Sequence, residues 1–109
     1  MGARRILLDQ GAPVPLRKHL APHAVSIAFE QGWEKLKNGE LIQEAEAAGF
    51  SLLITTDQNL KYQQNLAGRR LAILVLMTTS WPRIEKAVEA VREAVDAAGA
   101  GAYSELPIP

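Results

Sequence analysis

Three short apolar runs, each broken off at a turn, constrain the fold of this chain more than any other feature. Residues 6–8 lead directly into Asp9, and residues 52–56 lead directly into Asp57. The third run covers residues 71–77. A strand buried on both faces of a parallel sheet reads as a continuous apolar run. The runs therefore predict central strands of a buried, largely parallel sheet.

Turn and cap signals place helices and further strands between these runs. Asn38 is a good N-cap for a helix that Gly49 stops. Thr79 or Ser80 caps a last helix with apolar residues at helical spacing, and Gly99 ends it. The predicted strands are residues 4–9, 24–29, 52–56 and 71–77 with a short edge strand at 102–106, and the predicted helices are 16–20, 38–48 and 80–98.

This alternation of strands and helices defines the predicted fold class. It is α/β: one domain over residues 1–109, built as a largely parallel sheet flanked by helices in three layers. In such a fold all strands end at the same end of the sheet, and each following helix begins there. Asp9, Asp57 and Glu40, in the first turn of the helix at 38–48, are therefore predicted to meet at that end.

Composition limits the class of protein. The chain has no cysteine, which excludes disulfides, thiolate catalysis and cysteine-based zinc sites, and its two histidines are too few for a histidine-rich metal centre. Its net charge is zero, so the overall field does not draw it to nucleic acid. The longest apolar run is far shorter than the ~20 residues that span a bilayer. We therefore expect a cytoplasmic protein without a membrane segment.

The acidic residues are the candidate chemistry. A buried, unpaired carboxylate costs several kcal/mol or a shifted pKa, and a shared cation removes that cost for Asp9 and Asp57. Carboxylate oxygens suit Mg²⁺ or Mn²⁺, which can assist phosphodiester hydrolysis. The alternative roles are structural, because aspartate commonly forms turns after strands and an acid in a first helical turn, such as Glu40, is favoured by the helix dipole.

Four separated blocks of sequence together resemble the PIN-like domain family, and within it the small toxin-type bacterial proteins. The blocks cover almost the whole chain: residues 6–11 with Pro13 and Pro15, the loop at Gly32 and Trp33, residues 38–41, and residues 53–60. The resemblance implies a PIN-type sheet whose acidic cleft binds Mg²⁺ or Mn²⁺ and cuts single-stranded RNA. Many such proteins are the toxin of a toxin-antitoxin pair, which implies an antitoxin partner, and homodimers are common among them.

Carried over by position, the resemblance makes Asp9, Glu40 and Asp57 the catalytic and metal-binding residues. Two amides depart from the pattern, because many relatives have acids where this chain has Asn38 and Asn59. An amide oxygen can still bind a cation or position a water, but it supplies no charge. The departures leave open a site with one metal ion, or a degenerate site, in place of a two-metal site.

Further residues near the same end of the sheet are predicted to assist or to bind substrate. Thr56 ends the second acid-tipped run, and Lys61 and Tyr62 follow it, where Tyr62 could stack on a base. Thr78 and Thr79 follow the run at 71–77; a hydroxyl there could bind a phosphate, although a helix-capping role is the stronger expectation.

Three functions remain open from the sequence. The leading one is a Mg²⁺- or Mn²⁺-dependent ribonuclease. The second is a PIN-like protein-interaction module without turnover, which the amides at 38 and 59 favour. The third is a phospho-acceptor receiver domain, which fits least because paired acids after the first strand and a lysine after the fifth are both missing.

Overall fold

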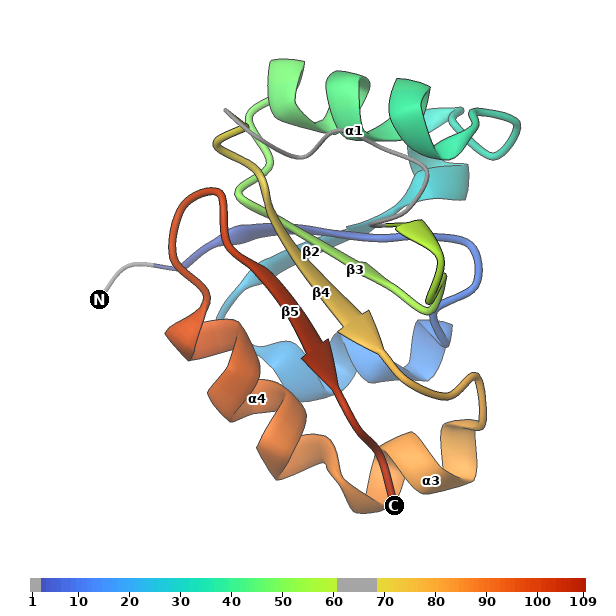
Figure 1. Ribbon diagram of the computed structural model, residues 1–109, viewed down its shortest axis with the longest axis vertical. Coiled ribbons are helices and arrows are strands. Elements are labelled where there is room, and N and C mark those ends of the chain that lie inside the picture. The colour runs from blue at the N-terminus through green and yellow to red at the C-terminus, as the bar shows by residue number, and fades with distance from the viewer. Residues whose placement is uncertain (1–2, 61–68) are drawn as a thin grey trace.

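A five-stranded, all-parallel sheet forms the centre of the molecule (Figure 1). The structure is a computed structural model that describes residues 3–60 and 69–109. The strands lie in the order β2-β1-β3-β4-β5. Their bounds are β1 Arg5–Leu8, β2 Ala24–Ile27, β3 Leu52–Thr55, β4 Ala72–Leu76 and β5 Tyr103–Leu106. The predicted α/β fold class, with its largely parallel sheet, is confirmed.

The three apolar runs are the three central strands. β3 and β4 are buried along their whole length, and β1 is buried except at Arg5. In the register of the sheet, Leu8 lies beside Ile27 of β2 on one side and beside Ile54 of β3 on the other. Apart from Thr55, the buried side chains of these strands are apolar on both faces, because helical layers cover both faces.

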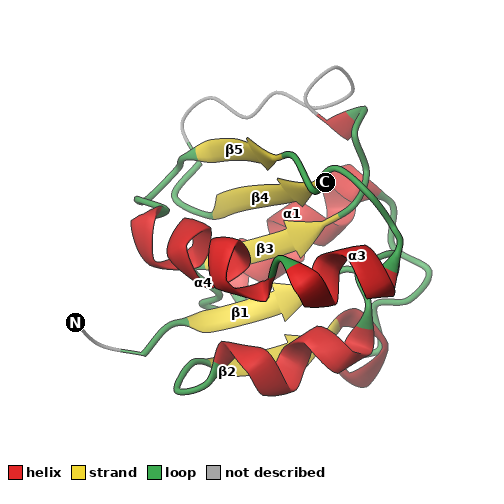
Figure 2. Cartoon of the chain, turned by 90° about the horizontal axis from the view of Figure 1, so that it is seen from below, coloured by secondary structure: helices red, strands yellow, loops and turns green. Residues whose placement is uncertain are grey.

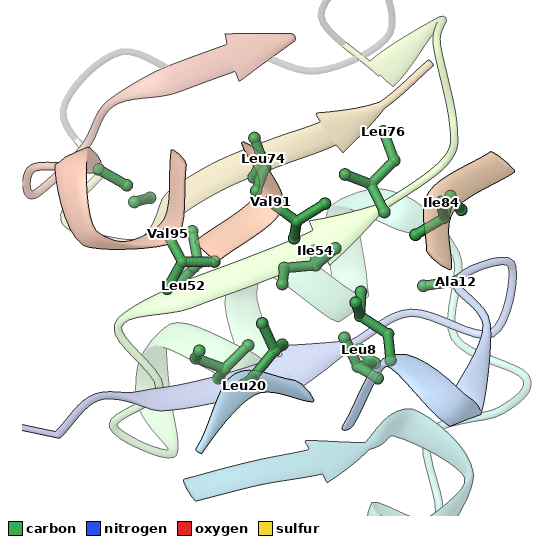
Figure 3. Close-up of a cluster of buried hydrophobic side chains, with 14 residues drawn as sticks. Leu8, Ala12, Leu20, Leu52, Ile54, Leu74, Leu76, Ile84, Val91 and Val95 are labelled. Carbon is green, nitrogen blue, oxygen red and sulfur yellow. The ribbon is translucent and has the colours of Figure 1, made fainter. Parts of the chain in front are cut away.

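Two hydrophobic clusters hold these layers against the sheet. One face is covered by the 3₁₀ helix η1 (Val14–Leu20) and by the α-helices α3 (Trp81–Lys86) and α4 (Val88–Ala97); Figure 3 shows this cluster. The other face is covered by the 3₁₀ helix η2 (Ala28–Gln31) and by α1 (Asn38–Ala47). Side chains alternate between the clusters along each central strand, so that Ile6 and Leu8 point to the first and Leu7 to the second.

The connection from β4 to β5 has an unusual hand. Its helices, α3 and α4, lie on the same face as η1, although this connection crosses the sheet in the direction opposite to the one from β1 to β2 (Figure 2). The β1-to-β2 connection has the usual right hand of parallel sheets, so the β4-to-β5 connection is left-handed. As a result α4 packs beside η1, and both helices share one hydrophobic cluster.

Most element boundaries lie within two residues of the predicted ones, and two of the differences have a clear local cause. The second strand ends at Ile27 and not at residue 29, because the Glu30 carboxylate accepts a hydrogen bond from the Ile27 N–H (3.2 Å) and the chain turns into η2. The last helix is divided at Ala87, where φ is −109°. Ile84 and Val91, on either side of this bend, are both fully buried in the cluster on that face.

The helix at 38–48 is close to its prediction. α1 starts at Asn38, so the N-cap position falls on Lys37. Gly49 follows the end of the helix with φ of +88°, the left-handed conformation that favours glycine after a helix. Within the described residues, no helix has the length and apolar character needed to cross a membrane.

Candidate functional site

Asp9 stands at the carboxyl end of the sheet, where the strands end, and a tight turn fixes its position. Its backbone N–H donates to the Ile54 carbonyl (2.9 Å), which extends the pairing of β1 with β3. Its carbonyl accepts from the Ala12 N–H (2.9 Å) and closes the turn, while Oδ1 accepts from the Gln10 N–H (2.7 Å). The carboxylate is half-buried and points along the end of the sheet toward β3.

Thr55, the last residue of β3, links the two aspartates. Its hydroxyl donates to Asp9 Oδ2 (2.9 Å) and accepts from the Asp57 N–H (3.1 Å). Only 1% of Thr55 is exposed, and it is the one buried polar residue of the described chain. Asp57 Oδ1 in turn accepts from the Asn59 N–H (2.9 Å). The structure therefore places Asp9 and Asp57 in one hydrogen-bonded network, which includes the Asp9 carboxylate and the Asp57 N–H.

A glycine lets the two loops approach. A Cβ atom built on Gly11 would lie 2.6 Å from Thr56 Oγ1, closer than real Cβ contacts allow. The turn after β1 and the segment after β3 therefore touch at Gly11 and Thr56. A side chain at position 11 would therefore require Thr56, or the loop that carries it, to move.

The network lies at the topological switch point of the sheet. With the strand order β2-β1-β3-β4-β5, the chain leaves β1 toward one side of the sheet and enters β4 and β5 on the other. In open α/β sheets, ligands bind at the carboxyl ends of the strands where the connections diverge. Asp9 and Thr55 flank this position.

Glu40 has a local partner in the structure. Its Oε1 accepts a hydrogen bond from the Lys37 N–H (3.2 Å), the reciprocal half of a helix capping box, and the residue is exposed. Among residues 3–60 and 69–109, no group of three histidine, aspartate or glutamate side chains is close enough to hold a metal ion. The structure therefore joins two of the three predicted acids, and Glu40 as a ligand stays a prediction.

The predicted accessory residues divide into three groups. Asn59 is exposed and contacts the network through its N–H, and Thr56 touches it through the approach to Gly11. Thr78 Oγ1 accepts from the Ser80 N–H (3.1 Å) at the start of α3, a capping role, and Thr79 is exposed. Asn38 begins α1, and Lys61 and Tyr62 lie outside the described residues.

The donor groups of the network are of the chemical kind that binds a small hard cation. Mg²⁺ is typically bound by one or two carboxylates and keeps several of its waters. Asp9 and Asp57 supply two carboxylates, and each oxygen of Asp9 has a second lone pair besides the one that accepts its hydrogen bond. Thr55 orients Asp9 in the way that residues behind the ligands of metal sites commonly do.

Two residues of the site have no role in the sequence prediction. Thr55 and Gly11 belong to the motifs that carry the acids, but the hydroxyl link and the close approach depend on how β1 lies beside β3. The sequence does offer one signal, which is that Thr55 and Thr56 end an otherwise apolar run. Buried polar groups are almost always hydrogen-bonded, so such a residue predicts a partner.

Comparison with protein-family models, with characterised proteins and with solved structures finds no match to this chain. The residues of the site are therefore the basis for inferring a function.

Proposed function

We propose that this protein is a Mg²⁺- or Mn²⁺-dependent ribonuclease that cuts single-stranded RNA. The observation that carries the proposal is the network in which Thr55 joins Asp9 to Asp57 at the switch point of the sheet. Ligand binding at the carboxyl ends of parallel strands and the affinity of carboxylates for hard cations both support it.

The residues have distinct parts in this proposal. Asp9 and Asp57 would hold the ion, which when bound supplies Lewis-acid stabilisation of a phosphodiester and of the leaving oxygen. Thr55 holds the Asp9 carboxylate in one orientation, and the Asp9 turn and the Asn59 N–H fix the acid-bearing loops. The antitoxin partner, the homodimer and the cytoplasmic location rest on the resemblance and the composition, and they stay predictions.

Cleavage of a labelled, unstructured RNA in Mn²⁺ tests the proposal. We expect cleavage by the wild-type protein, its loss with EDTA, and a loss of at least about 100-fold with Asp9→Asn or Asp57→Asn. Asp96→Asn is the matched control, because this exposed acid of α4 faces His23 away from the network. Circular dichroism and thermal unfolding check that each variant remains folded.

Glu40→Gln separates the two roles of Glu40. Glutamine can keep the hydrogen bond to the Lys37 N–H, since capping boxes accept either residue. Retained cleavage shows that Glu40 acts only as a cap, whereas loss of cleavage with an intact helix makes it a third ligand.

The interaction module is the second candidate, and the lack of a three-acid group among the described residues favours it. Wild-type protein that neither cleaves RNA nor binds Mn²⁺ at millimolar concentration would contradict the nuclease and leave the module. The receiver domain keeps its difficulty in the structure, because β1 is followed by Asp9 and then Gln10 in place of paired acids. A labile acyl phosphate on Asp57 after treatment with a small phosphodonor would be needed to support it.

A further inference from the structure

Two large apolar side chains are exposed in the described part of the chain, and both lie near Asp9. Phe29 is 68% exposed and Val14 is 53% exposed. Phe29 is in η2, directly after β2, and Val14 is the first residue of η1, just beyond the Asp9 turn. Most large apolar side chains of the described chain are buried, so their exposure at one end of the sheet needs an explanation.

The register of the sheet brings Phe29 close to the acidic network. Leu8 of β1 lies beside Ile27 of β2, so Asp9 and Ala28 leave the sheet side by side and Phe29 is the next residue. On the other side of Asp9 the network continues to Thr55. The segments that carry Phe29 and Thr55 therefore flank the Asp9 backbone on opposite sides.

An ion pair connects the two 3₁₀ helices that carry Phe29 and Val14. Arg17 Nη2 donates to Glu30 Oε1, and this pair joins η1 to η2 across the end of the sheet. In a 3₁₀ helix, side chains three residues apart are aligned, so Val14 stands in line with Arg17. The surface from Val14 through Arg17 and Glu30 to Phe29, here called the Phe29 rim, thus borders the Asp9 turn.

The two segments that carry the rim have more basic than acidic residues, which favours an anionic chain. Residues 14–20 and 28–37 contain four basic residues, Arg17, Lys18, Lys35 and Lys37, against two acids, Glu30 and Glu34. Lys18, Lys35 and Lys37 are exposed. Sites for unpaired nucleic acid commonly combine an exposed aromatic ring, which stacks on a base, with cations that approach the backbone, and these two segments supply both kinds of side chain.

We propose that Phe29 stacks on an unpaired base of the RNA substrate, next to the phosphodiester that Asp9 and Asp57 act on. The inference rests on the proposed function and deepens it, because it explains a requirement for single-stranded RNA: bases within a duplex are already stacked. Val14 forms the apolar border of the rim, and Lys35 and Lys37 contribute a nonspecific attraction to the backbone that salt weakens.

Binding of an unstructured RNA decamer with a single 2-aminopurine tests this proposal in the Asp57→Asn background with EDTA. Stacking on Phe29 quenches the fluorescence of the modified base. We expect Phe29→Ala to weaken binding by about 5- to 150-fold, the range measured for removal of one aromatic stacking residue, and to abolish the quenching. Because Phe29 is exposed, the substitution leaves the fold intact.

Two further variants separate stacking from apolar contact. Phe29→Tyr keeps the ring and should keep both affinity and quenching, whereas Phe29→Leu keeps an apolar side chain but loses both. In the cleaving protein, Phe29→Ala should raise KM more than it lowers kcat. Affinity, quenching and KM that do not change on Phe29→Ala would overturn the inference, as would RNA binding in the leucine variant as tight as in the tyrosine variant.

The outcomes also separate this inference from the proposed function. Cleavage by the wild-type protein with no effect of Phe29→Ala removes the stacking role and leaves the nuclease. Binding and quenching that depend on Phe29 in a protein that never cleaves would support the stacking role and contradict the nuclease. A change in sedimentation on Phe29→Ala, with no effect on RNA, would make the rim a protein interface and overturn the inference.

Discussion

The two ends of the sheet use charged residues in opposite ways. At the amino end, where the strands begin, Arg4 donates from Nη1 to the Val95 carbonyl (2.6 Å) and from Nη2 to the Ala98 carbonyl. Arg5 donates from Nη1 to the Ala48 carbonyl (2.5 Å) and lies over the Phe50 ring, 4.6 Å from its centroid. At the carboxyl end, Asp9 and Asp57 meet a threonine hydroxyl and the N–H groups of turns.

The arginines at the amino end and the aspartate at the carboxyl end have different kinds of hydrogen-bond partner. The last carbonyls of a helix lack partners within the helix and carry its negative dipole end, so Arg4 and Arg5 complete α4 and α1 and stabilise the fold. The partners of Asp9 orient a carboxylate without neutralising it, because neither a hydroxyl nor an amide carries a charge. Arginines that bond to the carbonyls of helix ends stabilise the fold. A carboxylate that its partners orient but do not neutralise, such as Asp9, indicates a binding site.

The largest expected effect is at the amino end. Arg4→Met keeps the apolar stem but removes the hydrogen bonds to the Val95 and Ala98 carbonyls, and we expect a loss of about 3 kcal/mol in the free energy of unfolding. Urea unfolding followed by circular dichroism measures it, with the exposed Arg83→Met as control. An unfolding midpoint equal to that of the wild type would mean that α4 does not depend on Arg4.

The next largest effect is expected at the carboxyl end of the sheet, where a substitution should weaken Mn²⁺ binding more than it lowers stability. Thr55→Val removes the hydroxyl that joins Asp9 to Asp57 while keeping the volume of the side chain. Residues that orient metal ligands typically contribute about 10- to 100-fold to affinity, and we expect Mn²⁺ binding, measured by calorimetry, to weaken by that factor. Thr55→Ser should restore it. Unchanged Mn²⁺ affinity in the valine variant would contradict the orienting role.

A smaller effect is expected where the two acid-bearing loops touch. Gly11→Ala places a Cβ 2.6 Å from Thr56 Oγ1, and relief of this contact should cost about 1 kcal/mol of stability. Gly99→Ala is the matched control, because a Cβ there meets no atom within 4 Å. Thermal unfolding of both variants gives the comparison. Equal melting temperatures would show that the loops separate without cost.

The smallest effect is a pH dependence from the ion pair beside the acidic network. The hydrogen bond from Arg17, helped by the one from the Ile27 N–H, lowers the pKa of Glu30 below its usual 4.5. A carboxylate whose pKa is lower in the folded state contributes stability above its unfolded pKa, and this contribution is lost as pH falls through the folded pKa.

Glu30→Gln should therefore reduce the difference in unfolding free energy between neutral pH and pH below 4.5. The reduction should be small, because Glu30 is exposed and solvent screens its ion pair with Arg17. Urea unfolding at the two pH values measures it. An unchanged difference would show that Arg17 and Glu30 interact too weakly to affect folding.

The sequence predicts the amino end less well than the carboxyl end. Apolar runs that stop at Asp9 and Asp57 predict both the strands and the meeting of these acids, because parallel strands must end together. Nothing local indicates that Arg4 reaches α4, since the spacing of Ile84 and Val91 predicts a helix but not the face of the sheet it covers. Glu40 shows the converse difficulty, because one acid in a first helical turn fits both a cap and a ligand.

The left-handed connection from β4 to β5 also determines when the protein can complete its core during synthesis. Arg4, beside β1, and its partner Val95, in α4, are 91 positions apart in the chain, yet a hydrogen bond joins them. Until α4 has left the ribosome, one apolar face of the sheet lacks its largest cover. Chains that stop before residue 88 would therefore present bare leucine and isoleucine side chains to the cell, which makes them targets for chaperones and for aggregation.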